Sequence, residues 1–164
     1  MTDTASRFRE YVHLDRKRMG DGLTPQEIQR WLTLKRHLAA RFSGRSSDPA
    51  TDTRVSVRVP TNMPLSFEDE GQLRRSLMTN LSRGGLFVAT EHLVEIGTRI
   101  LLRIRIERDG TTLTVPAEVV CHDLGPDLRH RLGFGLRFLD LEPDVRRRID
   151  ALYEQVLLEA SEKD

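Results

Sequence analysis

The chain has 164 residues, and its 26 lysines and arginines are nearly balanced by 25 aspartates and glutamates, which gives a net charge of +1. This length excludes two large domains but allows one domain with appended helices. The near-neutral charge argues against a general nucleic-acid-coating protein, so any binding site for an anion must be local.

Cysteine content and hydropathy further restrict the kinds of protein that this sequence can encode. Cys121 is the only cysteine, so neither an internal disulfide nor a cysteine-rich zinc site can form, and we expect a buried core thiol. The chain has no run of the roughly eighteen apolar residues that a membrane-spanning helix needs, and its first residues are polar. We therefore expect a cytoplasmic protein without membrane insertion.

The first segment, residues 1–42, is predicted to be a helical hairpin. Its first helix covers about residues 6–19, and Phe8, Tyr11 and Val12 share one face. In the second helix Thr24, Pro25 and Glu27 form a capping-box pattern.

An apolar stripe follows on this second helix. Its members are Ile28, Trp31, Leu32, Leu38 and Phe42. We expect the stripe to pack on the rest of the chain, on another copy in a homodimer, or on a protein partner. An ordinary core face is the simpler interpretation for any one of its residues.

Residues 43–53 are polar, contain Gly and Pro, and are predicted to be a flexible linker. Alternating apolar residues then indicate six short strands within residues 54–141, a spacing that is typical of a barrel. The alternating positions are Leu65 and Phe67; Leu77 and Thr79; Leu86 and Val88; Ile100, Leu102, Ile104 and Ile106; Leu113, Val115, Ala117 and Val119; and Leu132, Phe134, Leu136 and Phe138. Turns are expected at Glu68 to Gly71 and at Asp109-Gly110.

The last segment, residues 142–164, is predicted to be a helix that starts near Pro143. Its apolar face is expected to contain Val145, Ile149, Leu152, Tyr153 and Val156. Arg146, Arg147 and Arg148 span nearly a full turn, so they cannot all face one phosphate track, and a solvated face is expected.

Two short motifs carry the functional argument. Arg54 and Arg58 form an R-x-x-x-R pair before the first strand, and residues 80–85 read N-L-S-R-G-G. A guanidinium matches phosphate oxygens and the O6/N7 edge of guanine, and its flat face stacks on purines. Asn80 and Ser82 offer short hydrogen-bonding side chains, while Gly84 and Gly85 permit positive φ and close ligand approach. The two motifs together suggest an anionic nucleotide site.

At these motifs the chain resembles the PilZ family over roughly residues 51–140, and the strand Gly133 to Phe138 agrees with the G-x-G-x-x-F strand of that family. The resemblance implies a mainly β fold: a six-stranded antiparallel β-barrel with an N-terminal helical hairpin and a C-terminal helix. It also implies cyclic di-GMP as the ligand. Arg54 and Arg58 would then grip its guanines and phosphates, Asn80 and Ser82 would hydrogen-bond to it, and the glycines at 84 and 85 would leave room for it.

Other chemistry has little support in the sequence. The five histidines are scattered, so neither a metal site nor a general base with a partner is expected. Ser82 lies outside a G-x-S-x-G elbow. We therefore expect no catalytic residues, no metal and no cofactor other than the ligand.

Two functional hypotheses remain. The first is a cyclic di-GMP receptor that transmits the signal to a protein partner by ordering the arginine-bearing linker. The alternative is a PilZ-like adaptor that binds no nucleotide and acts through protein contacts in motility or surface-structure regulation.

Overall fold

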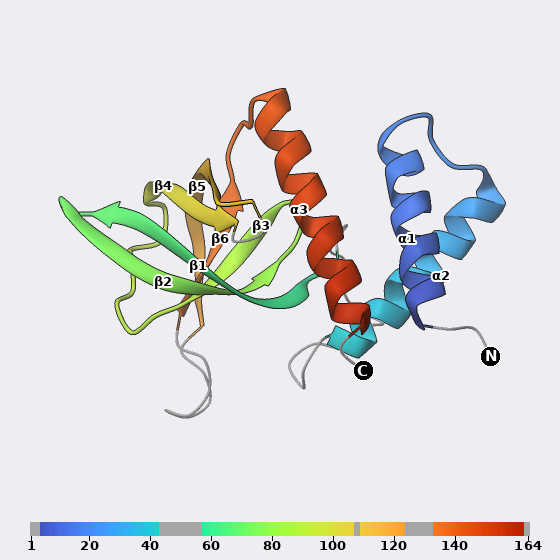
Figure 1. Cartoon of the computed structure of the whole chain (residues 1–164), viewed down its shortest axis with the longest axis horizontal. Helices are drawn as coiled ribbons and strands as arrows, with labels where there is room; N and C mark the ends of the chain where they lie inside the picture. The colour runs from blue at the N-terminus through green and yellow to red at the C-terminus, as the bar shows by residue number, and fades with distance from the viewer. Residues whose placement is uncertain (1–3, 43–56, 107–108, 124–132, 163–164) are drawn as a thin grey trace. The chain divides into compact units, whose positions relative to one another are not determined.

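Six β-strands and three α-helices form the part of the chain described by the structure, a computed structural model (Figure 1). The described residues are 4–42, 57–106, 109–123 and 133–162. They fall into two units, one of residues 1–59 and 153–164 and the other of residues 60–152. The linker expected at 43–53 lies outside the described residues.

The second unit contains the β-barrel. Its strands close in the order β1-β2-β3-β6-β5-β4, and neighbouring strands run antiparallel (Figure 1). The strands are β1 (Val59–Asp69), β2 (Gln72–Leu81), β3 (Gly85–Ala89), β4 (Arg99–Ile106), β5 (Thr111–Asp123) and β6 (Gly133–Phe138). The expected six-stranded antiparallel barrel is confirmed.

The barrel core follows from the alternation in the sequence. On β4 and β5 the inward residues are buried and the residues between them are exposed or half-buried, because successive side chains of a strand point to opposite faces. Phe67 on β1 and Phe134 on β6 meet edge to face with ring centroids 5.9 Å apart, a preferred aromatic geometry.

Both hairpin turns form, but the first is shorter than predicted, because Glu68 and Asp69 are the last residues of β1. Glu70 and Gly71 have φ of 52° and 78° and join β1 to β2 in a tight turn, where positive φ matches the twist of the strands. Gly110 has φ of 72°, and the Asp109 carboxylate accepts hydrogen bonds from both the backbone N–H and the hydroxyl of Thr111. These bonds lower the pKa of Asp109.

The predicted inward face of β2 is wrong. Leu77 is 44% exposed, whereas Met78 and Leu81 are fully buried. The register of β2 against β3 shifts between Met78 and Asn80, which is the signature of a β-bulge at Thr79. The extra residue allows Met78 and Leu81, three positions apart, to face the core together.

The predicted burial of Cys121 is also wrong, because the thiol is exposed. A second register shift lies on β5 between Val119 and Cys121. Val119 points inward and is fully buried, and the bulge at Val120 breaks the alternation that would have buried Cys121.

The first unit joins α1 (Thr4–Met19) and α2 (Pro25–Phe42) to the second half of α3 (Pro143–Glu162). Phe8, Tyr11 and Val12 on α1 are buried as predicted. Arg16 donates from Nε to Glu154 at 2.8 Å, so α1 is bound to the second half of α3. Burial raises the pKa of the Tyr11 phenol far above its usual range, so Tyr11 stays neutral.

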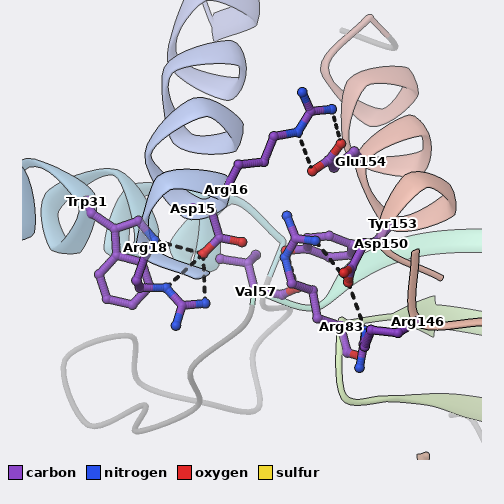
Figure 2. A network of polar contacts seen from close by, with 10 residues as sticks. All are labelled: Asp15, Arg16, Arg18, Trp31, Val57, Arg83, Arg146, Asp150, Tyr153 and Glu154. Carbon is purple, nitrogen blue, oxygen red and sulfur yellow. Dashed lines mark hydrogen bonds and ion pairs between the residues drawn. The ribbon is translucent and has the colours of Figure 1, made fainter. Parts of the chain in front are cut away.

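A buried carboxylate that the sequence did not indicate lies between α1 and α2. Asp15 is fully buried; it accepts a hydrogen bond from the indole N–H of Trp31 at 3.0 Å and pairs with Arg18 at 3.0 Å (Figure 2). The Arg18 guanidinium also lies 4.9 Å from the centre of the Trp31 ring, within cation–π range. A buried charge is tolerated only when it is paired in this way.

The predicted stripe of α2 is partly wrong. Trp31 and Leu38 are buried, but Ile28 is 42% exposed, and Leu34, only 2% exposed, takes its place in the stripe. Positions 31, 34 and 38 follow the i, i+3, i+7 spacing of one helix face, and position 28 lies at the edge of that face. The homodimer proposed for this stripe stays a prediction.

The predicted face of α3 is confirmed for its central residues, which are at most 4% exposed: Ile149, Leu152, Tyr153 and Val156. Val145 is half-buried. Of the three consecutive arginines, Arg147 and Arg148 are exposed and pair with Asp144. Arg146 departs from the expected solvated face, because it is half-buried and pairs with Asp150.

The capping box at the start of α2 is confirmed and gives a pH-dependent prediction. Thr24 and Glu27 exchange hydrogen bonds at 3.0 and 3.2 Å. The hydrogen bond from Lys17 has the largest effect on the Glu27 carboxylate, and the hydrogen bond from the Thr24 backbone amide has the next largest. Together they lower the pKa of Glu27 from an ordinary 4.5 to about 2. The ionised Glu27 carboxylate therefore stabilises the folded protein fully above its ordinary pKa of 4.5. This stabilisation is lost as the pH falls through the pKa of about 2 that Glu27 has in the folded protein.

We expect Glu27→Gln to destabilise the protein at pH 7 and to differ less from the wild type as pH falls from 4.5 to about 2. Unfolding midpoints of both proteins, followed by circular dichroism across this range, check the prediction. A difference that does not change with pH would contradict it.

Candidate functional site

The second motif forms the turn between β2 and β3. Ser82 donates its backbone N–H to the Gly85 carbonyl at 2.9 Å and its hydroxyl to the same oxygen at 3.2 Å. The side chain of Ser82 is half-buried. Ser82 therefore closes the turn, and its hydroxyl oxygen keeps lone pairs that can accept from a ligand.

Asn80 is placed by the β-bulge. It pairs with Phe87 directly after the register shift and is half-buried. Bulges often lie beside binding sites because they change the direction of a side chain. The bulge therefore gives Asn80 an orientation that regular alternation would not.

The two glycines have different surroundings, and neither has the positive φ that the sequence suggested. A Cβ on Gly85 would lie 2.1 Å from the Leu136 carbonyl oxygen, so β3 can pair with β6 only without a side chain there. A Cβ on Gly84 would meet no atom within 4 Å. Gly85 is thus required by the barrel, whereas Gly84 leaves open space at the tip of the turn.

Arg83, between these residues, was not singled out in the sequence, yet its side chain is only 7% exposed. Its guanidinium pairs with Asp150 of α3 at 3.1 Å. Arg146 donates to the Arg83 carbonyl and also pairs with Asp150 at 2.9 Å (Figure 2). The start of α3 therefore holds both the side chain and the backbone of Arg83.

The first motif lies at the end of the other unit. Arg54 is outside the described residues, and Arg58 is exposed. The neighbours of Arg58, Val57 and Val59, are at most 2% exposed. The Val57 carbonyl accepts a hydrogen bond from the Tyr153 hydroxyl at 2.8 Å (Figure 2). The backbone before Arg58 is thus anchored, and Arg58 itself is exposed.

The structure therefore brings together Asn80, Ser82, Gly84 and Gly85 at one turn and places Arg58 in the other unit. The juxtaposition of the arginines with the turn remains a prediction from the sequence.

The described residues also bear on metal binding and on membrane insertion. Within the described ranges, no group of three or more His, Cys, Asp or Glu side chains could hold a metal ion. Described histidines form local contacts, such as His92 with Asp69 at 2.7 Å and His122 with the Val94 carbonyl at 2.6 Å. Among the helices that the structure describes, none is long and apolar enough to cross a membrane.

Comparisons with known proteins agree with the fold. A family model described as "PilZ domain" matches residues 52–155. The search of curated proteins gives no match.

Three solved structures illustrate the similarity. The PilZ domain of Escherichia coli YcgR with c-di-GMP is 18% identical, with a TM-score of 0.57, over 68% of this chain and 97% of that chain. The K. pneumonia MrkH–c-di-GMP complex is 15% identical, with a TM-score of 0.58, over 70% of this chain and 56% of that one. Bacillus subtilis MotI/DgrA, an inhibitor of motility, is 19% identical, with a TM-score of 0.54, over 63% of this chain and 50% of that one. The chain thus spans only about half of MotI/DgrA and MrkH, and at these identities the likeness shows the fold alone.

Proposed function

The chain belongs to the PilZ domain family, because the family model covers well over half of its 164 residues, and on this premise we propose that it is a receptor for cyclic di-GMP. The observation that carries the proposal is the occurrence of both motifs, R-x-x-x-R and N-x-S-x-x-G, in a chain with this barrel. Two similar solved structures, the YcgR PilZ domain and MrkH, contain c-di-GMP.

The chemistry of the motif residues fits this ligand. Cyclic di-GMP carries two phosphates and two guanines, and a guanidinium recognises either group through paired hydrogen bonds. We assign this role to Arg54 and Arg58. Arg58 is exposed on an anchored backbone, so its side chain can reach a ligand without unfolding the chain around it.

The turn supplies the second half of the proposed site. Asn80 and Ser82 offer an amide and a hydroxyl, and the space around Gly84 allows a flat ligand to approach the backbone. The ligand role assigned to Gly85 is indirect: its missing side chain permits the β3–β6 pairing that ends the turn.

In the proposed signalling mechanism the chain has four parts. They are the N-terminal helical hairpin, the linker, the barrel and the C-terminal helix, at residues 1–42, 43–53, 54–141 and 142–164. Binding orders the linker at 43–53 around the ligand and changes how the N-terminal helices meet a protein partner. A ligand can shift such an equilibrium only through its different affinities for the two states. In this proposal the arginines supply that difference, because they bind fully only when the linker is closed.

Isothermal titration of the intact chain with cyclic di-GMP tests the proposal. We expect saturable binding, and no comparable binding of GMP, which offers only one guanine and one phosphate. Absence of heat at concentrated protein with ligand in excess, supported by an unchanged melting temperature, would reject the receptor function and favour the nucleotide-independent adaptor.

A further inference from the structure

Helix α3 contacts the chain at two places beside the proposed ligand residues, although none of its residues belongs to either motif. In the barrel unit, Arg146 and Asp150 contact Arg83. In the helical unit, Tyr153 contacts Val57. Only three positions separate Asp150 from Tyr153 on the same helix.

The contact with the turn fixes the residue at its centre. The buried Arg83 guanidinium pairs with the partly buried carboxylate of Asp150, and a buried charge that loses its partner becomes costly. Arg146 holds the Arg83 carbonyl from the same helix. Helix α3 therefore holds Arg83 by its guanidinium and by its carbonyl, and this restrains the backbone of the adjacent Ser82 and Gly84.

The contact with Val57 fixes the residue before Arg58. Tyr153 is fully buried and Val57 is 2% exposed, and their hydrogen bond is 2.8 Å long. Buried backbone carbonyls need such a partner. The direction in which the chain enters Arg58 is therefore set by the Tyr153 hydroxyl.

We infer that α3 positions proposed ligand residues within each unit, with Asp150 holding the turn at Arg83 and Tyr153 holding the Val57 backbone next to Arg58. This inference rests on the proposed cyclic di-GMP function and adds residues that touch no ligand. Ligand groups that are held before binding lose less conformational freedom on binding, so contacts that hold them raise affinity.

Asp150→Asn and Tyr153→Phe test the inference in the intact chain. The first keeps the shape of the side chain but removes its charge, and the second removes only the hydroxyl. We expect each to weaken cyclic di-GMP binding by about tenfold in titration calorimetry. The matched control is Asp144→Asn on the same helix, whose carboxylate pairs with the exposed Arg147 and Arg148, and it should bind like the wild type.

A second readout separates positioning from general destabilisation. In Asp150→Asn the amide resonances of Gly84 and Gly85 should shift before ligand is added, and Asp150→Glu should partly restore both the resonances and the affinity. If Asp150→Asn does not fold, Arg146→Met tests the other contact of α3 with Arg83, because a thioether cannot donate to the Arg83 carbonyl.

The outcomes distinguish this inference from the proposed function. Failure of the wild type to bind cyclic di-GMP would reject the function itself. Wild-type binding with unchanged affinity in folded Asp150→Asn and Tyr153→Phe would overturn the positioning role, as would an equal loss in Asp144→Asn.

Discussion

Arg54→Ala and Arg58→Ala should each weaken cyclic di-GMP binding by about 5- to 150-fold, which corresponds to the roughly 1–3 kcal/mol of a lost bidentate contact to a base. No other side chain combines a planar fork of donors with a face that stacks on purines. Titration calorimetry on the two variants measures the effect. Lysine at either position should restore only part of the affinity, because an ammonium offers charge without the fork.

The matched control is Arg103→Ala. Arg103 is an exposed arginine on β4, outside both motifs, and its removal changes the net charge by the same amount. Its affinity for the ligand should remain within about twofold of the wild type, since exposed charges that make no contact are screened by salt. Equal losses in all three variants would indicate a general electrostatic effect and would contradict the assigned site.

Gly85→Ala should lower the free energy of unfolding by about 3 kcal/mol, at the upper end of overpacking effects. A methyl group there would lie 2.1 Å from a backbone carbonyl oxygen, that of Leu136, so β3 and β6 would have to separate. Because the obstacle is backbone, no rotamer change relieves the clash. Denaturant unfolding followed by circular dichroism measures the loss.

Gly84→Ala is the control for this prediction. A Cβ at Gly84 would meet nothing within 4 Å, and its φ is not positive, so the unfolding free energy should change by less than about 0.5 kcal/mol. If Gly85→Ala proved as stable as Gly84→Ala, the pairing of β3 with β6 would not have the register described.

Features that depend on neighbouring residues could be predicted from the sequence. The capping box of Thr24 and Glu27 formed as expected, because both partners lie within one helical turn. The Asp109-Gly110 hairpin formed for the same reason, since its φ requirement is met by the glycine itself.

Features that depend on strand register could not be predicted. The bulges near Thr79 and Val120 reversed the burial of Leu77 and Cys121. A bulge is defined by the partner strand, and a single strand with apolar residues on both faces does not reveal it.

The candidate site shows the same limit. Its motif residues were visible because they match a family pattern, but the role of Arg83 depends on Asp150, which lies far along the chain on α3. Arg83 lies in the turn after β2, where the sequence gave no reason to expect an arginine that is almost fully buried. The available signal in the sequence was Asp150, an acid beside the apolar face of the helix expected at residues 142–164. A carboxylate that is partly buried by such a face needs a partner of opposite charge.

The central claim is that cyclic di-GMP binds both motifs at once, and NMR of the isotope-labelled intact chain with the ligand tests it most directly. The account predicts intermolecular contacts from the ligand to the Arg54 and Arg58 side chains and to the amides of residues 80–85 in the same complex. Contacts confined to other surfaces, or resonances that do not change with ligand in excess, would contradict it.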